Sequence, residues 1–112
     1  MRTTVITMIN AEHLWEILVP TVRPNGRFIR TKCHREWDSR VRRISGGLSV
    51  FKPIIGYWTN NSGILFKERM IPVRIRCSEA EIKEIARMTL KFYEQEAVMY
   101  YKISSECYIL ER

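Results

Sequence analysis

Residues 71–92, with the sequence IPVRIRCSEAEIKEIARMTLKF, contain the change of pattern that decides the fold. Up to Cys77, apolar side chains alternate with arginines, which is typical of a strand with one buried and one solvated face. From Ser78 onward, apolar side chains recur every three or four residues, as on one face of a helix. Ser78 and Glu81 match a capping box, in which each side chain accepts a hydrogen bond from the other residue's backbone N–H. The stretch therefore predicts a strand followed at once by a helix over about Glu79–Glu94.

A long β-hairpin is predicted to end in this strand. Residues 48–58 and 64–77 form its two arms, and residues 60–63, Asn-Asn-Ser-Gly, give a dense turn signal between them. Pro53 and Gly56 interrupt the first arm. Because proline lacks an N–H and glycine weakens a strand interior, the first arm is expected to be an edge strand with a bulge or bend.

The first half of the chain predicts another strand and another helix. Residues 14–22 are rich in bulky and β-branched apolar side chains and precede the turn signal Pro-Asn-Gly at 24–26, which indicates a strand. Over residues 29–45, apolar side chains recur at helical spacing, with arginines on the opposite face. Gly46-Gly47 then ends this helix, because glycine readily adopts the left-handed conformation of a helix C-cap.

A final strand over residues 97–103 completes the order β-α-β-β-α-β, and residues 107–110 are a candidate for an extra short strand. With right-handed crossovers, this order predicts a ferredoxin-like α+β fold with both helices on one face of a four-stranded antiparallel sheet. Residues 1–112 have the length of a single domain. We expect a homodimer formed through the open face of the sheet, because the aromatic bulk exceeds what one small core needs. The aromatic residues in question are Trp15, Phe51, Trp58, Tyr100 and Tyr101.

Composition predicts a soluble cytoplasmic protein. Apolar residues make up 46% of the chain and charged residues 28%, with no apolar run near the ~18–20 residues of a membrane span. Residues 1–10 contain one basic residue and no cleavage-site pattern, so no signal peptide is expected. The three cysteines are far apart and form no C-x-x-C pair, and no P-loop or dinucleotide fingerprint occurs. We therefore expect neither a metal nor a cofactor, and free thiols in a reducing compartment.

The excess positive charge is concentrated in one segment. The formal net charge is +7, from 19 basic and 12 acidic residues. Residues 23–52 contain nine of the basic and two of the acidic residues, so this segment alone has a net charge of +7. Such a local positive field attracts anions, including nucleic acid, nucleotides and acidic protein surfaces. A solvated basic helix face without a ligand would have the same composition, and charge alone does not decide between the two.

Acid–base candidates lie at three positions. His34 and Asp38 are four residues apart on the first predicted helix, so they share a face on which the carboxylate can orient the imidazole. A surface ion pair would give the same spacing. Glu68 lies in an otherwise apolar strand context, where it either faces solvent or is buried and needs a partner.

The second half of the chain resembles a family of small bacterial and phage proteins of unknown function. The resemblance rests on Gly46-Gly47-Leu48, on the G-x-W of Gly56-Tyr57-Trp58, on Glu68 and on Gln95-Glu96-Ala97-Val98. It covers about half of the chain and implies a ferredoxin-like fold and a phage-related origin. It implies no reaction, and it leaves out the basic helix.

Three hypotheses follow from these observations. The first is a dimeric binding protein for an anionic ligand, either a nucleotide-type small molecule or nucleic acid, without catalysis. The second is a small enzyme of phosphodiesterase or isomerase type that uses His34, Asp38 and Glu68 as acid–base groups. The third is a protein-interaction module. For the first, the candidate ligand-binding residues are Arg30, Arg35, Trp37, Arg42, Arg43, Trp58 and Gln95, with the arginines neutralising charge and the indoles stacking.

Overall fold

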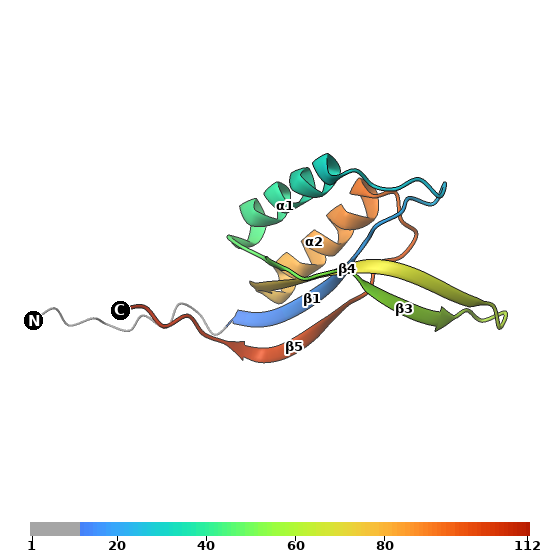
Figure 1. Ribbon diagram of the computed structural model, residues 1–112. Helices are drawn as coiled ribbons and strands as arrows, with labels where there is room; N and C mark the ends of the chain where they lie inside the picture. The colour runs from blue at the N-terminus through green and yellow to red at the C-terminus, as the bar shows by residue number, and fades with distance from the viewer. Residues whose placement is uncertain (1–11) are drawn as a thin grey trace, which may run out of the picture.

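A computed structural model of the chain describes residues 12–112 (Figure 1). The prediction that no signal peptide is present concerns residues 1–10 and lies outside the described residues. Two helices lie on one side of a sheet, and the chain enters and leaves the sheet at the same end (Figure 1). The elements are β1 (Glu12–Pro20), α1 (Thr31–Ser45), β2 (Ser49–Val50), β3 (Ile54–Thr59), β4 (Leu65–Cys77), α2 (Glu79–Phe92) and β5 (Tyr100–Cys107).

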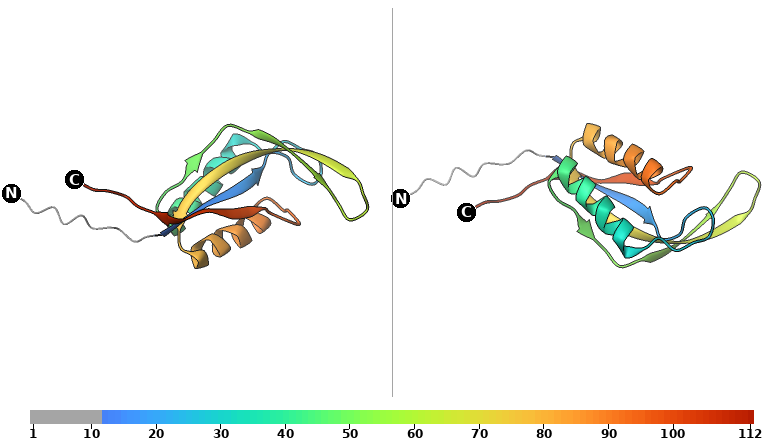
Figure 2. Two further views of the ribbon diagram at one scale, coloured as in Figure 1. Left: turned by 90° about the horizontal axis from the view of Figure 1, so that it is seen from below. Right: turned by 90° about the horizontal axis from the view of Figure 1, so that it is seen from above.

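All strand pairs are antiparallel, and β4 is the strand around which the sheet is organised. The order across the sheet is β2-β4-β1-β5, and β3 also pairs with β4. Figure 2 shows both helices on one face of the sheet, with the β3–β4 hairpin extending beyond them. The ferredoxin-like α+β prediction is therefore confirmed.

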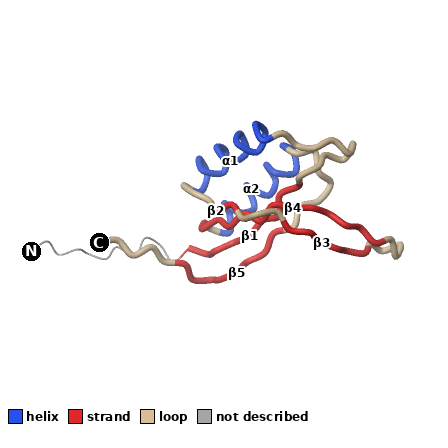
Figure 3. The backbone as a smooth tube through the Cα atoms, in the orientation of Figure 1, coloured by secondary structure: helices blue, strands red, loops and turns tan. Residues whose placement is uncertain are grey.

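The predicted first arm of the hairpin is divided into two strands, β2 and β3 (Figure 3). Pro53 lies between them and has no N–H to offer the β4 ladder. The sheet consequently has five strands in place of the predicted four.

The predicted extra strand over residues 107–110 is wrong. A single strand, β5, runs to Cys107, which pairs with Glu12 at the start of β1. Residues beyond Cys107 have no further β1 partner among the described residues, so the ladder stops there.

The helices are fixed to the sheet by a core built from both. Val73, Ile75 and Cys77 of β4 are fully buried beneath Ile82 and Ile85 of α2. At the helix ends, the capping box of Ser78 and Glu81 forms as predicted, and Gly46 adopts the left-handed conformation that ends α1, with φ 87°.

The first half of β4 pairs only with β3, because the ladder between β4 and β1 ends at Pro20–Met70. The hairpin formed by β3 and residues 65–70 is thus not covered by the helices (Figure 2). Within residues 12–112, no helix is long and apolar enough to cross a membrane.

Candidate functional site

We call the sheet face that the helices leave uncovered the open face. Directly opposed residues of antiparallel strands point to the same side of the sheet. Glu16 and Arg74 are such a pair and bond to each other on the face opposite the buried Val73 and Ile75. Side chains two residues apart on a strand share a face, so the same face includes Met70, Glu68 and Phe66.

The hairpin part of the open face forms a strip of three cross-strand pairs. These pairs are Ile54–Met70, Gly56–Glu68 and Trp58–Phe66. The rings of Trp58 and Phe66 are stacked, with centroids 4.4 Å apart and planes 13° apart. Trp58 is 46% exposed, and Glu68 is exposed next to this aromatic pair. A flat apolar surface and a free carboxylate therefore lie side by side.

Gly56 has a steric role in this strip. A Cβ at this position would lie 2.5 Å from the Met70 side-chain methyl carbon. Met70 therefore lies over the glycine, where its thioether forms an apolar floor beside Glu68. Any larger residue at position 56 would displace this flexible side chain. The glycine of the G-x-W motif thus shapes the surface next to the glutamate.

An ionic cluster continues the open face over the body of the sheet. Arg74 Nε donates to Glu16 Oε1 at 3.1 Å, and the hydroxyl of Tyr101 donates to the other carboxylate oxygen. The Arg74 guanidinium also lies 4.7 Å from the centre of the Phe51 ring. Glu16 is only 8% exposed and has bonds on both oxygens, so it orders one neighbour on β4 and one on β5.

The open face can bind a ligand in which a flat ring is joined to hydrogen-bond donors or to a cation. The Trp58–Phe66 pair offers a stacking surface, and Glu68 can accept from a pair of hydroxyls or contact a positive centre. Among residues 12–112, no group of three or more histidine, cysteine or acidic side chains is arranged to hold a metal ion.

His34 and Asp38 lie on the other side of the sheet from Glu68. His34 Nδ1 is 2.7 Å from the hydroxyl oxygen of Tyr93, which is fully buried between the helices. Burial lowers the pKa of His34 and raises the pKa of Asp38, and each group opposes the other's shift through its charge. The structure thus does not bring His34 and Asp38 together with Glu68, so the three do not share one site, and whether any of them acts in a reaction stays a prediction.

Trp37 does not offer a stacking surface. Its ring is 1% exposed, and its indole N–H donates to Thr89 Oγ1 at 2.9 Å. Thr89 in turn donates to the carbonyl of Ile85 at 2.6 Å. The prediction of Trp37 as a ligand-binding residue is corrected accordingly, because the helical stripe that contains it forms the core between α1 and α2.

The predicted arginines lie on and just before α1, and their side chains are exposed to solvent. They are Arg30, Arg35, Arg42 and Arg43. Gln95 follows α2 and donates to the carbonyl of Tyr93 at 3.1 Å. Of the predicted ligand-binding residues, only Trp58 shares a surface with Glu68, and whether the arginines bind an anion stays a prediction.

Several open-face residues were not singled out as site residues by the sequence. Glu16 interrupts an apolar run, and Arg74 alternates with apolar residues, so each gave a signal of its own. Only the strand register reveals that they face each other. The further residues added by the structure are Phe51, Phe66, Met70 and Tyr101.

The comparisons with known proteins place the chain in a class by fold. No family model matches the sequence, and no curated protein matches it. The resemblance to small bacterial and phage proteins therefore stays a prediction at the level of sequence. Solved structures do match, and they share the ferredoxin-like α+β architecture.

A phage SAM lyase and divalent cation tolerance proteins of the CutA type are among these solved structures. A phage SAM lyase in complex with S-methyl-5'-thioadenosine has a TM-score of 0.68 and 14% identity, covering 95% of this chain and 91% of that one. CutA1, a divalent cation tolerance protein from Thermus thermophilus, has a TM-score of 0.61 and 7% identity, covering 82% of each chain. CutA1 from a psychrotrophic Shewanella species has a TM-score of 0.62 and 7% identity, covering 84% of this chain and 80% of that one. At these identities the likeness shows the fold alone.

Proposed function

We propose that this protein is a small lyase that cleaves an adenosine-containing sulfonium compound, with S-adenosylmethionine (SAM) as the substrate to test. The observation that carries the proposal is the exposed Trp58–Phe66 pair beside Glu68 on the open face. The near full-length fold match to a phage SAM lyase supports it. SAM is made and used inside cells, which fits the cytoplasmic location that the composition predicts.

In this proposal each group of the strip contacts a particular part of the substrate. The adenine ring stacks on Trp58, because every base offers a flat π-face to an aromatic side chain. Glu68 accepts hydrogen bonds from the two ribose hydroxyls, which sets the position of the nucleoside. The sulfonium then lies over the apolar side of the strip, near Met70. Glu68 is in this account a positioning residue.

The reaction needs no oxidant, water or cofactor. A carboxylate oxygen of the substrate's own aminobutyrate chain attacks the γ-carbon of that chain, which is bonded to the sulfonium. The carbon–sulfur bond breaks, and its electron pair stays on sulfur, which gives the neutral thioether S-methyl-5'-thioadenosine and a lactone. Carboxylate and sulfonium charges are both neutralised, so an apolar surface that excludes water favours the transition state over the charged substrate.

A second copy of the chain would supply the missing wall of this site. In one copy the strip is open, with Ile54 43% and Trp58 46% exposed. A homo-oligomer formed through the open face covers these side chains and excludes water from the ligand. The expected homodimer is the smallest such assembly, and the measured mass decides the number of copies.

The test is incubation of the purified protein with SAM, followed by mass spectrometry for S-methyl-5'-thioadenosine and the lactone. Glu68→Gln weakens an interaction with two hydroxyl donors and is expected to lower kcat/KM by about tenfold or more. Glu84→Gln removes the same charge from the exposed surface of α2 and is expected to leave kcat/KM within about twofold. If no product forms, or if both variants behave alike, the proposal is refuted.

A binding protein without turnover is the second candidate. The exposed arginines of α1 favour it, because they offer charge to an anion on a different surface. In that case SAM is unchanged after incubation, while an oligonucleotide or a nucleotide binds with an affinity that falls steeply as salt rises. The product assay and the salt series therefore separate the two functions.

A further inference from the structure

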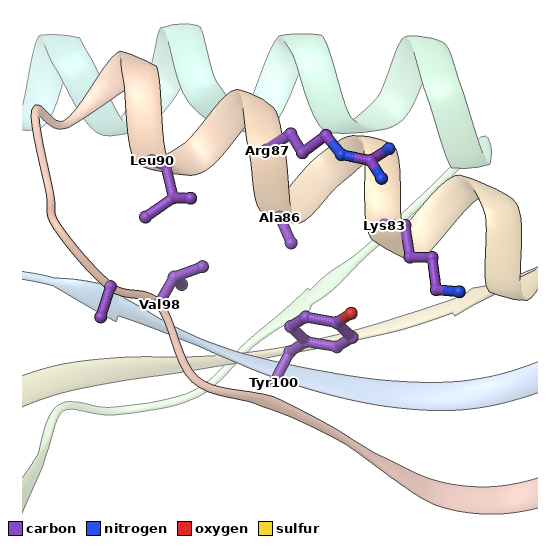
Figure 4. Close-up of a pocket in the computed structure, with 7 residues that line it drawn as sticks. Lys83, Ala86, Arg87, Leu90, Val98 and Tyr100 are labelled. Atoms are coloured by element: carbon purple, nitrogen blue, oxygen red, sulfur yellow. The ribbon is translucent and has the colours of Figure 1, made fainter.

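A groove between α2 and the edge strand β5 is independent of the Glu68 site. It has a volume of about 420 Å³ and is lined by Lys83, Ala86, Arg87 and Leu90 of α2 and by Ala97, Val98 and Tyr100. In Figure 4 the apolar side chains of Leu90, Ala86 and Val98 lie between helix and strand, and Lys83 and Arg87 extend along the rim. The groove thus combines an apolar floor with two cations on one side.

The cations of this rim are available to a partner. Arg87 forms no ion pair with any carboxylate of residues 12–112, and its side chain is exposed. Lys83 has only a long contact of 3.8 Å to Glu79 on the same helix, with both side chains at least half exposed. Such exposed pairs contribute little and exchange readily. An acidic group entering the groove would meet both cations.

The backbone of β5 is also available on its outer side. Leu18 N donates to the carbonyl of Met99, so the pairs of β1 with β5 alternate from that point between hydrogen-bonded and non-hydrogen-bonded. Tyr100 opposite Ile17, and Lys102 opposite Trp15, are non-hydrogen-bonded pairs. Their N–H and C=O groups therefore point away from β1, to the edge where no strand of residues 12–112 pairs.

From these two observations we propose that the groove binds an acidic segment of a partner protein in extended conformation, added as a further strand to the edge of β5. Side chains on one face of an antiparallel strand recur every ~6.8 Å. Lys83 and Arg87 are one helical step of four residues apart, which is a rise of about 6 Å. Acidic residues at alternate positions of the added strand therefore match the two cations, and an apolar residue two positions away from them meets Leu90 and Val98.

Other occupants fit this surface less well. Two copies paired through their β5 edges would bring their own Lys83, Arg87 and Lys102 side chains together, which is unfavourable. A nucleic-acid backbone offers phosphate oxygens but few donors, so the outward carbonyls of Tyr100 and Lys102 would stay unpaired against it. A peptide supplies donors and acceptors alternately, as the strand edge requires.

The test uses a fluorescent decapeptide with glutamate, glutamate and valine at three successive alternate positions and serine elsewhere, so that all three face the groove, with binding followed by anisotropy. Lys83→Gln with Arg87→Gln is expected to weaken binding by about tenfold. The matched control, Lys67→Gln with Arg69→Gln, removes the same charge from the exposed hairpin part of β4 and is expected to change the affinity by less than about twofold. A peptide N-methylated at alternate amides keeps its charge but cannot pair with a strand edge, and it should not bind.

Hydrogen exchange provides a second readout that does not depend on mutation. The amides of Tyr100 and Lys102 should exchange freely in the protein alone and become protected when the decapeptide binds, in wild type and in Glu68→Gln alike. Equal weakening by both double variants would show general electrostatics and overturn the proposal. The proposal would also be overturned if the decapeptide did not bind, or if the N-methylated peptide bound equally well. It would be overturned too if both amides were protected in the protein alone, because another copy would then already cover the edge.

Discussion

Replacing Trp37 with phenylalanine tests whether this indole stabilises the fold or binds a ligand. The change removes the bond from the indole N–H to Thr89 Oγ1, in a pair of side chains that are at most 1% exposed. A buried neutral hydrogen bond contributes about 1 kcal/mol. Loss of roughly 40 Å³ of side chain adds about 1 kcal/mol at ~24 cal/mol per Å³ of cavity. We expect the free energy of unfolding to fall by about 2 kcal/mol.

A double-mutant cycle with Thr89→Val makes this estimate specific. Thr89→Val alone leaves the buried N–H of Trp37 without an acceptor, which costs about 2 kcal/mol. When both partners are apolar, the hydrogen bond is lost only once. The double variant should therefore lose about 1 kcal/mol or more less unfolding free energy than the sum of the losses in the two single variants. Urea unfolding measures the free energy of unfolding of all four proteins, and an unchanged m-value shows that the differences are differences in stability.

Two results of this cycle would refute the reasoning. Additivity within ~0.5 kcal/mol would show that the bond between the two side chains does not contribute. A loss of affinity for S-methyl-5'-thioadenosine in Trp37→Phe, at a temperature where the variant is folded, would show that the indole contacts a ligand after all. Unchanged affinity with reduced stability is the expected outcome.

Two further predictions concern single side chains. Burial lowers the pKa of His34, so the unfolded state takes up the proton first, and stability should fall as pH is lowered from 7.5 through 6.5 to 5.5. In His34→Gln, whose amide can still bond to Tyr93, Tm should fall less over this pH range. The raised pKa of Asp38 stabilises the folded state as pH is lowered, so Asp38 does not cause the fall. An identical pH profile in the variant would therefore show that His34 does not cause it either. Tyr101→Phe removes one donor from the nearly buried Glu16 carboxylate and should lower the free energy of unfolding by about 1–3 kcal/mol in urea titrations, and no change would show that water replaces the hydroxyl.

Local signals in the sequence were sufficient for the element order. The alternation in residues 71–77, the capping box at Ser78 and the stop at Gly46 each depend on neighbours within a few positions, and each is found in the structure. The division of the first hairpin arm at Pro53 was also signalled locally. The end of β5 at Cys107 was not, because it depends on where β1 begins.

The candidate site depends on contacts between distant parts of the chain, which periodicity does not encode. Trp37 occupies the same helical stripe whether it is a core residue or a ligand contact, and only packing against Thr89 decides between them. The sequence predicts Trp58 and Glu68 as separate candidates, but their position on one face follows from the register of β3 with β4. A shift of one residue in that register would have put them on opposite faces.

The distribution of charge bears on the proposed substrate. SAM carries a sulfonium, an ammonium and a carboxylate, so it is a cation at neutral pH, while the protein has a formal net charge of +7. The exposed arginines of α1 lie in the helix layer (Figure 1), whereas the strand register puts Glu68 on the open face. Exposed charges separated by more than the Debye length of ~8 Å at physiological salt are largely screened from each other. The cations of α1 therefore oppose binding at the open face only weakly, and the exposed carboxylate of Glu68 can attract a cationic nucleoside to an otherwise basic protein.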